Sequence, residues 1–138
     1  MGVDARIEQA IQQVLAVSPV AHFVAVFGSR AKGRSRTDSD LDIAWLPVDR
    51  GVSLGDELQL QASLTRATGI EVDLVRVDQA STLCRFEVAR DGLLVQGSRE
   101  SFVRFRAEAT AEYIDYEPVL REAGERFRRR LAAGGAGT

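Results

Sequence analysis

The chain has 138 residues, which suffices for one domain with an ordinary hydrophobic core. Its 45% hydrophobic and 28% charged residues exclude a disordered chain, and its net charge of −2 gives no overall basic field for nucleic-acid binding. The single cysteine, Cys84, excludes an internal disulfide framework, is typical of the reducing cytosol and is expected to be a buried small side chain. No stretch is long and apolar enough to span a bilayer. We therefore expect a single cytoplasmic domain, 1–138, without membrane contact or a direct nucleic-acid partner.

The first half of the chain combines one predicted helix with two buried strands. Apolar residues at spacings of three and four predict a helix over residues 4–17, which ends at Ser18-Pro19. Residues 20–27 form a short, almost entirely apolar run, as in a strand buried on both faces. A polar, turn-like segment then leads to a second buried strand, 41–46, which Pro47 closes.

The second half adds two further helices and two strands. A helix begins after Ser53, a third strand covers residues 70–77 and another helix covers residues 81–90. Residues 93–95 are compatible with a short edge strand, and the chain is helical again from about residue 98. This order predicts an α/β or α+β fold, in which a small mixed sheet is flanked by helices.

A helical tail, about 98–131, follows a core of about 1–97. Pro118 lacks a backbone donor and clashes with the preceding turn, so we expect a kink or break near Glu117. The apolar residues of the tail fall on one stripe, which is expected to face the core and could in part dock a partner. The stripe consists of Phe102, Phe105, Ala109, Tyr113, Tyr116, Leu120 and Phe127.

The most informative stretch starts where the first strand ends. Gly28 has no Cβ, so a phosphate can approach its backbone, and Ser29 can donate both its hydroxyl and its backbone N–H. Arg30 and Lys32 would add positive charge at this point or, alternatively, are solvated surface charges. The stretch therefore predicts a binding site for the phosphates of a nucleotide.

Three carboxylates are candidates for binding metal at the other end of this site. Asp40 and Asp42 are two residues apart on a strand, so they point to the same face and repel each other unless a cation lies between them. Mg²⁺ suits such a position because it binds carboxylate oxygens together with substrate phosphates. Asp73 could complete a two-metal site if the third strand lies beside the second, although Glu71 competes for this role.

These residues carry a resemblance to a known family. Gly28-Ser29 followed after ten residues by Asp40-Leu41-Asp42 resembles the signature of the nucleotidyltransferase superfamily that includes DNA polymerase β. Residues 28–33 together with residues 39–42 resemble its smallest members, the minimal nucleotidyltransferases, or MNT proteins. The resemblance implies a polymerase β-like fold with Asp40, Asp42 and Asp73 on Mg²⁺. It also implies that Gly28 and Ser29 hold the triphosphate of ATP and that the third acid helps activate the acceptor hydroxyl.

The resemblance also implies a partner. MNT proteins are commonly paired with a helical HEPN protein in toxin–antitoxin systems, which implies that this chain is a type VII-like antitoxin that transfers AMP from ATP to a tyrosine of a HEPN toxin. Two alternatives stay open: a small-molecule or antibiotic nucleotidyltransferase that completes its site by dimerising, and an antitoxin that acts by binding alone. Antibiotic enzymes usually carry a larger helical domain, and binding alone has no use for clustered carboxylates.

Overall fold

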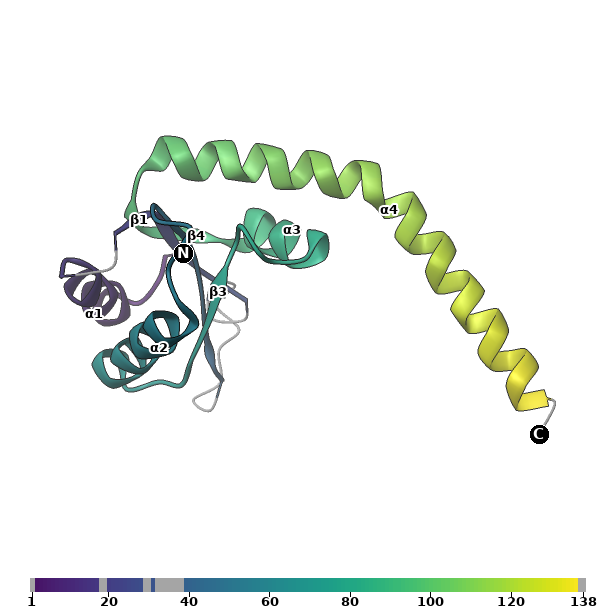
Figure 1. Ribbon diagram of the computed structural model, residues 1–138, viewed down its shortest axis with the longest axis horizontal. Helices are drawn as coiled ribbons and strands as arrows, with labels where there is room; N and C mark the ends of the chain where they lie inside the picture. Colours follow the sequence, from purple (N-terminus) through teal and green to yellow (C-terminus); the bar gives the residue numbers. More distant parts are fainter. Residues whose placement is uncertain (1, 18–19, 29–30, 32–38, 137–138) are drawn as a thin grey trace.

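The computed structural model describes residues 2–17, 20–28, 31 and 39–136. The elements in chain order are α1 (Ala5–Leu15), β1 (Ala21–Phe27), β2 (Leu41–Pro47), α2 (Leu54–Thr68), β3 (Val72–Arg76), α3 (Thr82–Asp91), β4 (Leu93–Gly97) and α4 (Arg99–Ala136), as Figure 1 shows. The strands form one sheet in the order β3-β2-β1-β4, in which β2 and β3 are parallel and the other neighbours antiparallel. The predicted α+β fold with a small mixed sheet is confirmed.

Helices cover both faces of this sheet. α1 and α2 pack on one face, where Leu41, Ile43 and Trp45 of β2 enter a shared apolar core. α3 and the first half of α4 pack on the other face, in a second core that includes Ala44 of β2. Because neighbouring residues of a strand point to opposite faces, Asp42 is directed to the side of α3.

Capping residues set the beginnings of α2 and α3. The Ser53 hydroxyl accepts a hydrogen bond from the backbone N–H of Asp56 at 3.1 Å, and the Ser81 hydroxyl does the same for Cys84 at 3.1 Å. Each bond satisfies a backbone donor that has no partner within its helix. The start of α3 matters for function because this helix follows β3 directly and leads back across the sheet.

α4 continues through the proline that was expected to disturb it. Pro118 lies inside the helix, and Figure 1 shows α4 bent near its middle but unbroken to Ala136. The prediction of a kink or break near Glu117 is met by a kink, and the helix continues past residue 131 to Ala136. Within the part of the chain that the structure describes, no helix is long and apolar enough to cross a bilayer.

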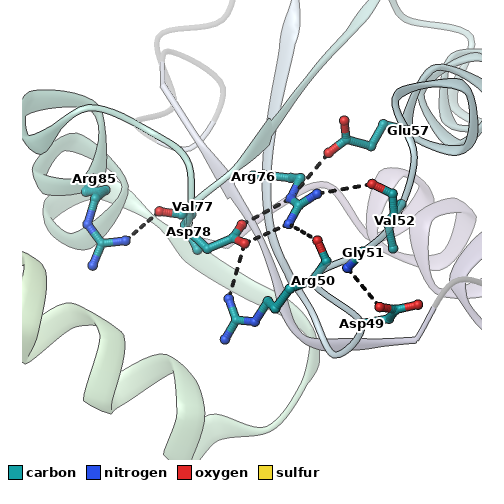
Figure 2. Close-up of polar contacts among 9 residues, drawn as sticks. All are labelled: Asp49, Arg50, Gly51, Val52, Glu57, Arg76, Val77, Asp78 and Arg85. Atoms are coloured by element: carbon teal, nitrogen blue, oxygen red, sulfur yellow. Dashed lines mark hydrogen bonds and ion pairs between the residues drawn. The ribbon is translucent and has the colours of Figure 1, made fainter.

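A buried arginine anchors the end of β3 to the loop between β2 and α2 (Figure 2). The Arg76 side chain is only 6% exposed, and it donates to the Asp78 carboxylate at 2.7 and 3.1 Å and to the Arg50 carbonyl at 3.1 Å. Burial would raise the pKa of Asp78, but the hydrogen bonds and charge of Arg76 hold it below its usual value. These contacts hold β3 against its surroundings and thereby fix the strand that carries Asp73.

Candidate functional site

The parallel pairing of β2 with β3 brings two of the predicted site residues together. Asp42 pairs in register with Phe27 of β1 on one side and with Asp73 of β3 on the other. Side chains at matched positions of neighbouring strands point to the same face, so both carboxylates are directed to the side of α3. The sequence predicts that Asp73 can join the site only if the third strand lies beside the second. The structure meets this condition, because β3 is the neighbour of β2.

Gly28 lies against this pair at the end of β1. Its φ is +76°, a conformation that residues with a side chain rarely adopt. A Cβ at this position would also lie 2.2 Å from Oδ2 of Asp42. Glycine is thus required both by the backbone conformation and by the close approach of the carboxylate.

A cavity of about 400 Å³ opens around these three residues. Its lining comes from the ends of β1 and β2, from β3 and from one face of α3. The lining residues are Phe27, Gly28, Asp42, Asp73, Val75, Cys84, Glu87, Arg90 and Asp91. A larger hollow of about 950 Å³ lies beside α1 and α2, but valines dominate its lining and it contains none of the predicted site residues. We therefore place the candidate site in the smaller cavity, where the chemically useful groups converge.

Sequence reasoning missed the contribution of α3. Cys84, Glu87 and Asp91 recur at spacings of three and four, so they share one face of the helix, and Arg90 lies beside them. This spacing, on a helix that directly follows the strand of Asp73, is the signal that could have identified them. The expectation that Cys84 is buried is wrong, because its side chain is half-buried and lines the cavity.

The cavity concentrates negative charge. Burial raises the pKa of Asp42, and the neighbouring charges of Asp73, Asp40 and Glu87 raise it further. Burial and the same acidic surroundings raise the pKa of the Cys84 thiol, so this group stays protonated at neutral pH. A bound cation would relieve the repulsion among the carboxylates, and this is the physical reason to expect a metal here.

The donor set fits magnesium, although the described side chains alone do not complete a metal cluster. Among the residues that the structure describes, no three His, Cys, Asp or Glu side chains form a group that could hold a metal ion. Asp42 and Asp73 are adjacent, whereas Asp40 is exposed just before β2 and does not line the cavity. Two carboxylates with an open side suit Mg²⁺, which retains waters and binds substrate phosphates.

The remaining predicted residues fall into two groups. Ser29, Arg30 and Lys32 lie outside the described residues. Glu71, the competitor of Asp73, is exposed and does not line the cavity. Asp73 is therefore the better candidate of the two.

Comparisons with known proteins point to one family. A family model described as polymerase beta, nucleotidyltransferase matches residues 9–101, which include the whole lining of the cavity. A comparison with curated protein sequences found no match.

Solved structures share this fold. A chain of a toxin–antitoxin complex with AMP-PNP is 25% identical, with a TM-score of 0.73, and the match covers 84% of this chain and 97% of that one. The complex of a tri-AMPylated Shewanella oneidensis HEPN toxin with its MNT antitoxin matches at 23% identity and a TM-score of 0.68, covering 85% of this chain and 95% of that one. A structure assigned to the minimal nucleotidyltransferases is 30% identical, with a TM-score of 0.54, and the match covers 62% of this chain and 86% of that one.

Proposed function

The chain belongs to the polymerase β family of nucleotidyltransferases, and from this premise we propose that it transfers AMP from ATP to a tyrosine hydroxyl of a partner HEPN toxin and thereby acts as an antitoxin. The observation that carries the proposal is the pairing of Asp42 with Asp73 beside Gly28 in one cavity. Nucleotidyl transfer needs such a site, in which phosphates can approach the backbone and carboxylates can hold metal.

The similar structures support the choice of nucleotide and acceptor. One of them contains AMP-PNP, and another pairs an AMPylated HEPN toxin with an MNT antitoxin. The match to the first covers almost the whole of that chain, so its fold and this one correspond over nearly their full common length. On that basis we propose that ATP is the donor of AMP and a HEPN protein the acceptor for this chain as well.

Each residue of the cavity has a proposed task. Gly28, together with Ser29, holds the β- and γ-phosphates because no Cβ blocks the backbone. Asp42 and Asp73 hold Mg²⁺, two ions in our proposal, with Asp40 completing the acidic set. Bound magnesium would neutralise charge on the triphosphate and on the departing pyrophosphate. The carboxylates are therefore both the metal ligands and the means by which the chain aligns ATP.

The transfer is a displacement at the α-phosphorus. The acceptor oxygen forms a bond to this phosphorus, and the bond to the oxygen that bridges to the β-phosphate breaks, so pyrophosphate leaves. The hydroxyl proton passes to the carboxylate of Asp73. This residue is exposed at the rim of the cavity, whereas Asp42 is half-buried, so Asp73 is the one that a hydroxyl on another protein can reach.

A labelling experiment tests the proposal. The protein is incubated with Mg²⁺ and the HEPN-domain protein that co-purifies with it, once with ATP labelled at the α-phosphate and once with ATP labelled at the γ-phosphate. We expect label on the partner from α-labelled ATP only. Asp42→Asn and Asp73→Asn should lower the rate at least 100-fold. Glu71→Gln is the matched control, because it removes an acid two residues from Asp73 that does not line the cavity.

The alternative functions give different results. If the partner is silenced without any label, and Asp42→Asn silences it equally well, the chain acts by binding alone. If label appears on an aminoglycoside and never on the partner, the chain is an antibiotic nucleotidyltransferase. Either outcome would replace the proposal.

A further inference from the structure

Arg90 of α3 is a positively charged residue in a cavity whose other charged residues are acids. Among the lining residues that the structure describes, Arg90 is the one basic side chain, and the four carboxylates are those of Asp42, Asp73, Glu87 and Asp91. Such a wall repels the triphosphate of ATP, and Mg²⁺ relieves this repulsion only where the metal binds. Arg90 is therefore the described side chain of the cavity that can attract a phosphate directly.

The position of Arg90 along the cavity indicates which part of the nucleotide it can reach. Leu93, at the start of β4, pairs with Val26 near the end of β1, so the last turn of α3 comes close to the end of β1. Gly28 follows β1 directly and lines the same cavity as Arg90. Arg90 therefore lies at the end of the cavity where the backbone of Gly28 is open to phosphates.

Two contacts hold the guanidinium of Arg90 in place. Its Nε and Nη2 donate to the Asp91 carboxylate at 3.1 and 2.9 Å, and its Cζ lies 5.5 Å from the centre of the Phe86 ring. Phe86 in turn stacks on Tyr113 of α4, with ring centroids 3.9 Å apart. Among the described residues, neither hydrogen bond of the guanidinium uses Nη1, so the N–H groups of this atom can donate to an anion. A planar group that is already oriented loses little freedom when it binds a phosphate.

We propose that Arg90 binds the β- and γ-phosphates of ATP and the pyrophosphate that they become. This inference rests on the proposed function, in which ATP donates AMP. When the bond between the α-phosphorus and the bridging oxygen breaks, that oxygen keeps the electron pair, so negative charge grows on the departing pyrophosphate. A guanidinium beside this group stabilises the transition state more than it stabilises bound ATP. Arg90 thus contributes both to the affinity for ATP and to the rate of transfer.

Calorimetry on the full chain, without a HEPN-domain protein, tests this contact without reference to transfer. Arg90→Gln should raise the Kd for ATP and for inorganic pyrophosphate, each measured with Mg²⁺, at least tenfold. The Kd for AMP should change less than twofold, because AMP lacks the two terminal phosphates. Arg104→Gln is the matched control, since Arg104 is also exposed and paired with a carboxylate, that of Glu100 at 3.2 Å, but does not line this cavity. It should leave all three Kd values unchanged, and the melting temperature of each variant checks its fold.

Arg90→Lys separates the charge of this residue from its geometry. The variant keeps a positive charge but loses the planar fork that two phosphate oxygens can share. Its Kd for ATP should therefore lie between those of the wild type and Arg90→Gln. With saturating ATP and the HEPN-domain protein, kcat should fall in the same order, because the charge on the departing pyrophosphate is then less well stabilised. A full wild-type kcat in Arg90→Gln would contradict contact with the leaving group.

Two binding results would also overturn the inference. Equal weakening of ATP binding by Arg90→Gln and Arg104→Gln would show an effect of overall charge alone. Equal weakening of ATP and AMP binding by Arg90→Gln would show that the arginine does not act on the terminal phosphates.

Failure of the proposed function gives a different result. If the wild type binds ATP with the expected dependence on Arg90 but never labels the HEPN-domain protein, the proposed acceptor is wrong and the contact of Arg90 stands. If the HEPN-domain protein is labelled and Arg90→Gln binds ATP and transfers AMP as the wild type does, the function stands and the inference about Arg90 is wrong.

Discussion

Gly28 combines a left-handed backbone with direct contact to the carboxylate of Asp42. Gly28→Ala should therefore displace Asp42 and lower the rate of AMP transfer at least 100-fold, as measured with α-labelled ATP. Gly69→Ala is the matched control, because Gly69 has a similar φ of +73° but no atom within 4 Å of the added Cβ. It should lose about 1 kcal/mol of stability and keep its activity. Equal loss of activity in both variants would show that backbone strain, rather than the displaced carboxylate, is responsible.

Asp42 also makes stability depend on pH. Burial and neighbouring acids raise its pKa in the folded state, so its ionised form destabilises the fold. This penalty is absent below the unfolded pKa of about 3.9 and is complete once the pH exceeds the folded pKa. Asp42→Asn should therefore raise the melting temperature of the metal-free protein at pH 7, and the gain should disappear towards pH 3.

Magnesium provides the internal check on this prediction. Adding Mg²⁺ at pH 7 should raise the melting temperature of the wild type, because a ligand that binds the folded state stabilises it. The same addition should leave Asp42→Asn largely unchanged. Asp115→Asn, which removes an exposed carboxylate from α4, should behave as the wild type does. If the metal-free Asp42→Asn variant kept its higher melting temperature at pH 3, this would contradict the electrostatic origin of the stabilisation.

At the scale of elements, β3 is held by the buried guanidinium of Arg76. Arg76→Met should destabilise the protein by about 3 kcal/mol, because two loop carbonyls lose their donor and the Asp78 carboxylate keeps only its ion pair with Arg50. Urea unfolding measures this loss. Arg66→Met, at an exposed position of α2, should change stability by less than about 0.5 kcal/mol. A comparable loss in both variants would show that Arg76 is not an anchor.

The strands and most helices were predictable because periodicity and caps are local signals. The apolar runs before Gly28 and after Asp40 became β1 and β2, and Ser53 begins α2 as its residue type suggests. The role of α3 was not predictable from its apolar pattern, because the cavity receives the polar edge of the helix. Glu87 and Arg90 reach the site through the tertiary position of α3, which a local pattern does not contain.

Proline in a helix interior usually kinks or breaks the helix, and in α4 it produces a kink. Pro118 removes one hydrogen bond, yet the helix continues on both sides of it. The ion pair between Glu117 and Arg121 also spans the proline. The sequence therefore located the bend correctly.

In the whole molecule, the candidate site and the outer half of α4 are separate. The cavity lies at the end of the sheet where β1 finishes, between the strands and α3, whereas the outer half of α4 extends away from the domain (Figure 1). The overall charge of −2 hides this division, because acids gather in the cavity and arginines near the end of α4. The composition could exclude a uniformly basic protein, but only the fold shows where each charge lies.

The intact mass of the HEPN-domain partner, purified after co-expression with this chain, tests the central claim most directly. We predict that the partner carries one or more added AMP groups with the wild type. With Asp42→Asn, the partner should still bind the chain but have its unmodified mass. An unmodified partner that the wild-type chain nevertheless silences would contradict the account.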